Sequence, residues 1–328
     1  MIVVTGGAGF IGSNLVAALE HRGASPVSVV DVLGDADKAK NLRRRELDEL
    51  VDAARLEDFL RRREKEITHL VHMGAITSTT ERDAELITKT NVRLPQQLWR
   101  WCADHDVPFI YASSAATYGD GSRGFDDVGT PEGLAAFVPM NAYGRSKHDF
   151  DRWVATTVAA GDPLPPQWVG LKFFNVYGPN EYHKGDMRSV VTKNYETATR
   201  GEAVTLFRSH NDEYADGGQM RDFVYVKDCI EVLLWLIDHP DVNGLFNVGT
   251  GKAQTWLDLV GSLYTAVGQD LEVNWVDIPI DIRDRYQYFT EAKMNRLRAA
   301  GYDRPFRSVQ EGVADFVEQH LATHDRYV

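Results

Sequence analysis

Cysteine is scarce in this sequence of 328 residues, and long apolar runs are missing from it. Only Cys102 and Cys229 are present, far apart in the chain, so no disulfide framework is expected and a reducing cytoplasm is the natural compartment. No apolar run is long enough to span a bilayer, and no secretory signal sequence is recognisable. The sequence therefore predicts a cytoplasmic protein without a membrane as partner.

Positive charge is also in short supply, with 36 Lys and Arg residues against 48 Asp and Glu residues and a net charge of -12 at pH 7. Nucleic acids and anionic membranes are bound by basic surfaces, so neither is an expected partner. A ligand with phosphate groups would have to be held by local features, such as helix N-termini and a few placed arginines. Spacings typical of metal sites are missing, so no metal is expected. His69 and His72, which alternate on a predicted strand, are interpreted as structural.

The N-terminal stretch has the pattern of a dinucleotide-binding unit. A short apolar strand (2–4) leads into the string TGGAGFIG (5–12), and a helical pattern follows. Glycines at positions 6, 9 and 12 permit a tight turn, close approach of backbone amides to a pyrophosphate, and close packing of the helix. A second strand (27–30) ends in Asp31, where such a unit places an acid on the adenosine ribose. This order predicts a dinucleotide site rather than a structural glycine turn.

Strands and helices alternate further along the chain, which is typical of a doubly wound α/β sheet. More strands are expected at 50–52, 69–72, 109–111 and 168–173, and helices at about 55–66, around 90–101 and around Tyr143. Pro95 should bend the second of these helices or mark its restart. The polar stretch 210–219, rich in glycine and acidic residues, is interpreted as a surface insertion.

Tyr143 and Lys147 form a Y-x-x-x-K pair on a predicted helix, which places both side chains on one face about one turn apart. A phenol with a pKa of about 10 is a poor base at neutral pH. A nearby ammonium group would lower that pKa and let the tyrosine exchange a proton with a substrate hydroxyl. The same spacing fits a solvated helix face, so the pair alone does not decide between the two. Ser113 and Ser114 follow the strand at 109–111, at the edge where open α/β sheets bind ligands.

Together, these motifs resemble those of the extended short-chain dehydrogenase/reductase family, and the resemblance covers essentially the whole chain. TGGAGFIG matches the glycine loop of the family, Ser114 its active-site serine, Tyr143 and Lys147 its Y-x-x-x-K, and FFNVYGP (173–179) the segment after the sixth strand. Seven strings resemble the branch of the family that inverts C6 of an ADP-linked heptose. They are TSTTERD (77–83), YASSAATYG (111–119), FFNVYGPNEYHKGDMRS (173–189), RDFVYV (221–226), FNVGTG (246–251), YQYFT (286–290) and LRAAGYDRPF (297–306).

The resemblance implies a nucleotide-sugar isomerase that oxidises C6 of its substrate transiently to a ketone and returns the hydride to the opposite face. Tyr143 would act as one acid/base, Lys147 would lower its pKa and bind the nicotinamide ribose, and Ser114 would orient the substrate oxygen. Lys184 matches a lysine that the family places on the far side of the ketone as a second proton donor. Ser113 stays an alternative to Ser114.

The cofactor contacts of the family map onto the glycine loop, the ends of the neighbouring strands and the Tyr143 helix. They are Gly6, Gly9, Phe10, Ile11, Gly12, Asp31, Val32, Lys38, Asp52, Met73, Gly74, Ala75, Ile76, Thr77, Asn91, Tyr143, Lys147 and Val176. Asp31 alone would favour NAD, because a carboxylate repels a 2′-phosphate. The family nonetheless uses NADP, with a lysine that Lys38 matches and an asparagine that Val32 replaces. NADP is therefore the expected cofactor, with NAD as the alternative.

The substrate contacts of the family fall mostly in the second half of the chain. They are Ser114, Asn175, Lys184, Asp186, Lys193, Phe207, Arg208, Ser209, His210, Arg221 and Tyr286. The guanidinium of Arg221 would pair with the diphosphate of the nucleotide. Asp186 and Lys193 depart from the pattern, because the family has serine and histidine at these positions.

The predicted fold class is α/β, with a Rossmann-type doubly wound parallel sheet and a smaller, partly discontinuous C-terminal substrate domain. The dinucleotide-binding domain is expected at 1–175 plus about 221–250, and the substrate-binding domain at 176–220 plus 251–328. The resemblance also implies a homo-oligomer, which in the family is a pentamer. Two other functions use such motifs: another nucleotide-sugar epimerase, dehydratase or dehydrogenase, for instance one acting at C4, and a non-enzymatic dinucleotide sensor. The joint presence of Ser114, Tyr143 and Lys147 argues against the sensor.

Overall fold

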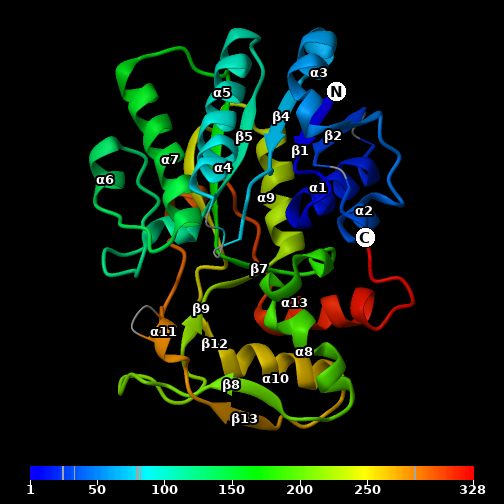
Figure 1. The fold of residues 1–328 in the computed structure, drawn as a ribbon, viewed down its shortest axis with the longest axis vertical. Helices are drawn as coiled ribbons and strands as arrows, with labels where there is room; N and C mark the ends of the chain where they lie inside the picture. The colour runs from blue at the N-terminus through cyan, green and yellow to red at the C-terminus, as the bar shows by residue number, and fades with distance from the viewer. Residues whose placement is uncertain (24–25, 33, 79–80, 82, 284–285) are drawn as a thin grey trace.

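The centre of the molecule is a seven-stranded parallel sheet with the strand order β11-β6-β5-β4-β1-β2-β3 (Figure 1). The computed structural model describes residues 1–328 except 24–25, 33, 79–80, 82 and 284–285. The strands of the sheet are β1 (Ile2–Thr5), β2 (Val27–Asp31), β3 (Glu49–Asp52), β4 (His69–His72), β5 (Phe109–Ser114), β6 (Trp168–Phe173) and β11 (Gly244–Val248). The predicted Rossmann-type doubly wound α/β fold is confirmed.

Buried apolar runs explain the inner strands, since every residue of β1 and β2 is buried, as expected for strands covered on both faces. The seventh strand, β11, was not among the predicted strands. It pairs in parallel with β6, and all five of its residues are buried. Its short apolar run is interrupted by Asn247, which leaves little pattern to read in the sequence alone.

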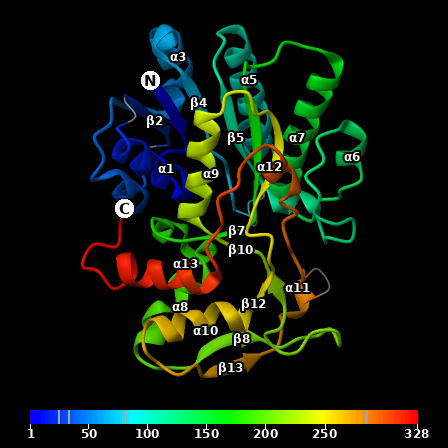
Figure 2. The same cartoon turned by 180° about the vertical axis from the view of Figure 1, so that it is seen from behind.

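Helices cover both faces of the sheet, as opposite views show (Figures 1 and 2). α1 (Phe10–His21) and α9 (Val226–Asp238) pack against each other on one face, and α4 (Ala84–Thr88), α5 (Leu94–Asp104) and α7 (Ala142–Ala160) lie on the other. The shorter elements around the sheet are α2 (Ala36–Ala39), η1 (Lys40–Leu42), η2 (Ala53–Arg55), α3 (Leu56–Arg63), η3 (Glu64–Glu66), η5 (Ala115–Tyr118), α6 (Pro131–Ala135) and α12 (Asn295–Ala299). The helix expected at 55–66 is thus α3 flanked by two 3₁₀ turns.

The expected effect of Pro95 is visible at the start of α5. A π-helical segment, η4 (Lys89–Arg93), runs directly into α5, and Pro95 lies in the first turn of α5. Proline has no N–H to donate to the preceding turn, so the helical hydrogen-bond ladder changes just ahead of it. The proline therefore marks a restart of the helix.

A smaller layer lies beyond the carboxyl edge of the sheet, at the bottom of Figure 1. Its helices are η6 (Tyr182–Met187), α8 (Val190–Thr199), α10 (Trp256–Ala266), α11 (Ile280–Arg283), α13 (Val309–Phe316) and η7 (Val317–Leu321). Its strands form three two-stranded pairs: β7 (Asn175–Tyr177) with β10 (Phe223–Tyr225), β9 (Met220–Arg221) with β12 (Gln254–Thr255), and β8 (Val204–Phe207) with β13 (Val273–Val276). The chain enters and leaves this layer more than once.

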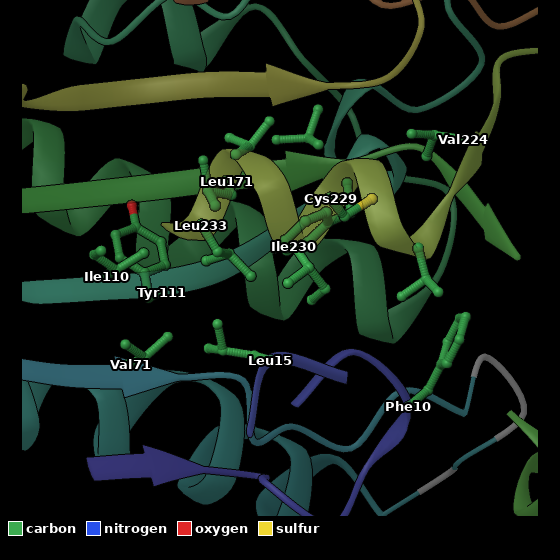
Figure 3. Packing of buried hydrophobic residues seen from close by; sticks show 14 of the residues in the cluster. Phe10, Leu15, Val71, Ile110, Tyr111, Leu171, Val224, Cys229, Ile230 and Leu233 are labelled. Carbon is green, nitrogen blue, oxygen red and sulfur yellow. The ribbon is translucent and has the colours of Figure 1, made fainter. Parts of the chain in front are cut away.

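The hydrophobic core joins the sheet to the helices of its faces. Leu15 of α1 and Leu233 of α9 lie over Val71, Ile110 and Leu171 of the central strands, and all are buried (Figure 3). Both cysteines are free and buried. Within the described residues, no helix is long and apolar enough to cross a membrane.

Candidate active site at the carboxyl edge of the sheet

The glycine loop joins β1 to α1, which opens with Phe10 and Ile11. Gly6 has a φ of +69°, a left-handed conformation that favours glycine, and a Cβ atom there would collide with the backbone of Gly74. A Cβ atom on Gly12 would meet the carbonyl oxygen of Gly6. No side chain caps the N-terminus of α1, so its first backbone amides are left for a ligand. The loop has the close backbone packing and the helix amides that suit a pyrophosphate.

The carboxylate of Asp31 lies buried beside this loop and is already partnered. It accepts hydrogen bonds from the backbone amides of Ala8 (2.8 Å) and Val32 (2.7 Å), and the Lys38 ammonium lies 2.5 Å away. The side chain of Val32 is exposed. Asp52 ends the neighbouring strand directly opposite Asp31 and caps the following turn. A ribose approaching Asp31 would therefore meet both a carboxylate and a lysine.

Asn91, a predicted cofactor contact, lies between the loop after β4 and α7. Its buried side chain accepts from the amide of Ile76 and donates to the carbonyl of Ile76, both at 2.9 Å, and donates to Ser146 Oγ at 3.0 Å. It thereby ties the loop after β4 to α7. In that loop Met73, Gly74, Ala75 and Ile76 are half-buried, and Thr77 is exposed.

His72 at the end of β4 is buried, and its Nδ1 lies 2.6 Å from Thr5 Oγ1. Burial lowers the pKa of His72 to about 3, so the ring is neutral at physiological pH. Among the described residues, no group of three or more His, Cys, Asp and Glu side chains could hold a metal ion.

The first turn of α7 sits tightly against the segment that follows Ser114. Asn141 caps the helix by accepting from the amide of Gly144 at 2.8 Å. A Cβ atom on Gly144 would lie 2.7 Å from the carbonyl oxygen of Ala116. Glycine at this position therefore lets the tyrosine helix approach the end of β5 closely.

The two adjacent serines at the end of β5 have separate partners. Ser114 hydrogen-bonds the phenol of Tyr143, and its Oγ accepts from the amide of Ala116 at 3.1 Å. Ser113 points the other way and donates to Asp151 Oδ2 at 2.7 Å. The geometry thus favours Ser114 over Ser113 as the serine that faces a substrate.

The pKa values of the tyrosine–lysine pair differ from the simple expectation. Lys147 is buried, donates to the carbonyl of Ala112 at 2.8 Å, and has its pKa lowered to about 8 by burial. Burial also raises the pKa of Tyr143, while the hydrogen bond from Ser114 lowers it in part. The predicted lowering of the Tyr143 pKa by Lys147 is therefore not found in the protein without ligands, because desolvation dominates.

Lys184 lies against the glycine loop. Its Nζ is 5.3 Å from the centroid of the Phe10 ring, and burial lowers its pKa. The preceding segment is fixed to the same loop by Asn41, whose Nδ2 donates to the carbonyls of Ala8 (2.9 Å) and Asn180 (3.0 Å). A lysine from the second half of the chain is thus held next to the predicted dinucleotide site.

The other residues predicted in the second half lie in mixed surroundings. Asn175 is exposed at the start of β7, and Val176 beside it is half-buried. Asp186 and Lys193, which depart from the family pattern, are both exposed, and neither belongs to any described ion pair. Within the described part of the chain, neither side chain forms a hydrogen bond or an ion pair with the residues of the site.

Arg221 is a buried cation without a carboxylate partner among the residues that the structure describes. Its guanidinium donates to the carbonyl of Met220 at 2.8 Å and to that of Gln287. It lies over the rings of Tyr286 (5.5 Å) and Trp256 (5.9 Å). Burial lowers its pKa, as expected for a charge taken out of water without an anion beside it. The position suits the binding of an anionic ligand, which would compensate the charge of the guanidinium.

A cleft of about 370 Å³ opens beside the tyrosine helix and includes the predicted residue Tyr286. Its lining comes from the segment after η5, Met140 just ahead of α7, the 210–219 stretch and the segment 286–289. The lining residues are Asp120, Gly121, Ser122, Phe125, Met140, Asn211, Glu213, Tyr214, Tyr286, Gln287, Tyr288 and Phe289. The stretch interpreted as a surface insertion is thus one wall of the cleft, and the sequence alone gave no sign of this.

The residues at 207–210 surround the same wall without lining the cleft. The ring of Phe207 packs edge-on against Tyr286, with centroids 6.1 Å apart. Arg208 pairs with Asp216 at 2.9 Å, and the amide of His210 donates to the hydroxyl of Tyr288 at 3.1 Å. The Ser209 hydroxyl donates to the carbonyl of Asn211 at 2.8 Å. These four residues, predicted as substrate contacts, pack against or hydrogen-bond residues of the same wall.

The glycine loop, the serine–tyrosine–lysine group and the fold together define a class that comparison with known sequences confirms. The sequence model of the NAD dependent epimerase/dehydratase family matches residues 2–249. The chain belongs to this family.

Individual relatives within the family bear more specific names than the family model. The ADP-L-glycero-D-manno-heptose-6-epimerase of Nitratidesulfovibrio vulgaris is 46% identical over 330 residues, and that of Fusobacterium nucleatum is 42% identical over 336 residues. Both alignments cover 100% of this chain and 100% of the relative. The crystal structure of Helicobacter pylori ADP-L-glycero-D-manno-heptose-6-epimerase matches with a TM-score of 0.78 at 28% identity and covers 97% of this chain and 95% of that one. Thermus thermophilus UDP-glucose 4-epimerase, in complex with NAD, matches with a TM-score of 0.71 at 27% identity over 97% of both chains.

Proposed function

We propose that this protein inverts C6 of ADP-D-glycero-β-D-manno-heptose to give ADP-L-glycero-β-D-manno-heptose. The observation that carries the proposal is the pairing of Ser114 with Tyr143 at the carboxyl end of β5, in a chain whose full-length relatives bear that name. The buried cation of Arg221 adds a place for the diphosphate of such a substrate.

The chemistry explains why a redox site would serve an isomerase. C6 of the heptose has no adjacent carbonyl, so its C–H bond is not acidic enough for simple deprotonation. Oxidation to a ketone removes the stereocentre, and return of the hydride to the other face resets it. A bound nicotinamide cofactor supplies this hydride chemistry. The protein has to orient the sugar and move the hydroxyl proton.

Tyr143 is proposed as the acid/base that exchanges this proton, with Ser114 orienting the same oxygen. Lys147 is proposed to hold the nicotinamide ribose and to stabilise the phenolate. Burial raises the pKa of Tyr143 and lowers the pKa of Lys147, so it favours the neutral form of both groups. Lys184 is proposed as the second acid/base, on the side of the glycine loop.

The test is incubation of the purified protein with ADP-D-glycero-β-D-manno-heptose, with the configuration at C6 followed by NMR. We expect an equilibrium mixture of the two C6 epimers and no net change in free NADPH or NADH. UDP-glucose is the control substrate, and it should stay unchanged at C4. Inversion of UDP-glucose, or stoichiometric reduction of added cofactor, would identify a C4 epimerase or a dehydrogenase instead.

Replacement of Lys184 by Met should lower kcat for epimerisation by about 100-fold or more, because one face of the ketone would lose its proton donor. The cofactor content of the purified variant should stay high, since Lys184 touches the Phe10 ring and not the amides of the loop. Lys65→Met, at an exposed lysine of η3, is the matched control. Full turnover of the Lys184→Met variant would reject the second acid/base.

The cofactor is proposed to be NADP, held by the glycine loop and by the Asp31–Lys38 pair. Membership of the family supports a nicotinamide cofactor of either kind. Lys38 supports NADP, because its ammonium lies 2.5 Å from Asp31 and compensates the carboxylate that would repel a 2′-phosphate. Denaturation of the purified protein and mass measurement of the released cofactor tests this proposal.

Replacement of Lys38 by Ala should reduce the preference for NADP over NAD by about 10-fold or more, because a charge-assisted contact to the 2′-phosphate would be lost. The affinities of the cofactor-free protein for NADP and NAD can be measured by quenching of protein fluorescence. Lys40→Ala is the control, since Lys40 lies nearby but is exposed and pairs with Asp37. Equal loss of affinity for NADP and NAD would assign Lys38 to the Asp31 ribose site only.

The proposed assembly is a homo-oligomer, a pentamer by likeness to the family, and the proposed compartment is the cytoplasm. Light scattering coupled to size-exclusion chromatography would give the mass of the assembly, and a monomer mass would reject the oligomer.

A further inference from the structure

A fully buried ion pair joins α7, the helix of Tyr143 and Lys147, to β6. Lys172 Nζ on β6 is 2.6 Å from Asp151 Oδ2 on α7, and neither side chain has any exposed surface. The burial of two charges is expensive, and apolar residues of the same volume often stabilise a fold equally well or better. The stability of the fold alone therefore gives no reason for charges at this place.

The pair is connected to the segments that carry Ser114, Tyr143 and Lys147. Asp151 accepts from Ser113 Oγ at 2.7 Å and from the Tyr111 hydroxyl at 3.2 Å, both on β5. Lys172 donates to Thr117 Oγ1 at 2.8 Å, in the turn that follows β5. Ser113 and Thr117 bracket Ser114 on both sides, so the ends of its short segment are fastened to one buried pair.

Asp151 also lies one helical turn from Lys147, on the same helix. We propose that the Asp151–Lys172 pair positions the catalytic group: it fixes the segment of Ser114 against α7 and holds a carboxylate one turn from Lys147. Asp151 and Lys172 are thus positioning residues, and Ser114, Tyr143 and Lys147 are the groups that they place. This role rests on the proposed function.

The charges around Lys147 show what this carboxylate does. Asp151 raises the pKa of Lys147 and opposes the larger effect of burial, which lowers it. His72 on β4 is neutral, because burial lowers its pKa to about 3, and burial raises the pKa of Tyr143 on α7 and of Tyr111 on β5. On β6, Lys172 is compensated by Asp151. Loss of the Asp151 charge should therefore lower the pKa of Lys147 further.

The experiment compares Asp151→Asn, Lys172→Met and the double variant Asp151→Asn/Lys172→Met. Each single variant leaves one buried charge without its partner and should lower the thermal unfolding midpoint, whereas the double variant removes both charges and should recover much of the loss. Its kcat for C6 epimerisation should nonetheless stay about 10- to 100-fold below that of the wild type, with a smaller change in KM. The alkaline limb of its kcat profile should move to lower pH, because Lys147 loses its proton more easily.

Asp228→Asn is the matched control, since Asp228 is also a buried carboxylate but pairs with Arg307 away from the catalytic group. It should lower the unfolding midpoint and leave kcat per folded molecule unchanged. A double variant with the kcat and the pH profile of the wild type would overturn the proposal. If the double variant does not fold, Ser113→Ala removes one link only, and an unchanged kcat in that variant would overturn the proposal in the same way.

A second measurement separates this inference from the proposed function. The affinity of the cofactor-free protein for NADP and NAD requires no sugar substrate, and it should fall in the double variant because Lys147 is displaced and less charged. If the wild type does not epimerise C6, the proposed function fails, and the affinity measurement still decides the positioning role. Unchanged cofactor affinity in the double variant would then overturn the positioning role of the Asp151–Lys172 pair.

Discussion

Replacement of Tyr143 by Phe is expected to lower kcat for C6 epimerisation by about 10²- to 10⁴-fold, the range for loss of a positioned acid/base. The phenylalanine keeps the ring and its packing and removes only the hydroxyl that Ser114 contacts. Binding of the cofactor and of the nucleotide sugar should change little, because neither the glycine loop nor Arg221 is altered. The measurement is kcat by NMR of the C6 epimers, together with the cofactor content of the purified variant.

Tyr264→Phe provides the control for loss of a buried phenol hydroxyl. Tyr264 is buried on α10 and hydrogen-bonds the carbonyl of Glu202, in the smaller layer below the sheet. This variant should lose about 1 kcal/mol of the free energy of unfolding and keep its activity. A Tyr143→Phe variant with more than about a tenth of the wild-type kcat would contradict the assignment of Tyr143 as the acid/base.

Local patterns predicted the parts of the site that depend on short segments. The glycines at 6, 9 and 12 and the acid at 31 are set by the geometry of one strand–turn–helix–strand unit, which is nearly the same wherever it occurs. The Tyr143–Lys147 spacing is likewise a property of a single helix turn. These features could be read from the sequence because neighbours along the chain decide them.

Other parts depend on segments that meet only in the folded chain. The hydrogen bonds of Asn91 to Ile76 and Ser146 are one example, because no spacing in the sequence indicates them. The Asp151–Lys172 pair joins α7 to the following strand, β6, across 21 positions of the sequence, and a single buried lysine in an apolar strand carries no spacing signal. No local pattern indicates such convergence.

The composition of the 210–219 stretch did not predict that it forms a wall of the cleft. A polar segment rich in glycine and acidic residues is typical of a surface loop, and its residues are indeed largely exposed or half-buried. Its place as a wall of the cleft depends on the ring of Tyr214, which packs on Tyr288 with centroids 5.2 Å apart. Contacts with distant segments, such as this one and the hydrogen bond from the His210 amide to Tyr288, hold this loop in place.

Replacement of Arg221 by Met should weaken binding of ADP and of the ADP-linked sugar by about 10- to 100-fold, as expected for loss of charge-assisted hydrogen bonds to a diphosphate. The thermal unfolding midpoint of this variant should not fall along with its affinity for ADP. The guanidinium is buried and has no carboxylate partner among the described residues, so its removal also removes the cost of desolvating that charge. The carbonyls of Met220 and Gln287 lose a donor, which offsets part of this gain. Calorimetry with ADP and thermal unfolding measure the two effects separately.

Arg221→Lys separates charge from geometry, because lysine keeps a cation but cannot form the planar, two-pronged contact of a guanidinium. Its affinity for ADP should fall between those of the wild type and the Met variant, whereas the affinity for NADP should be the same in all three. A Met variant that binds ADP as tightly as the wild type would show that the diphosphate lies elsewhere. A marked fall in its unfolding midpoint would show that Arg221 holds Met220 and Gln287 together as a structural tie. An affinity loss with an unchanged or raised midpoint is the result expected of a residue whose charge is kept unpaired for a ligand.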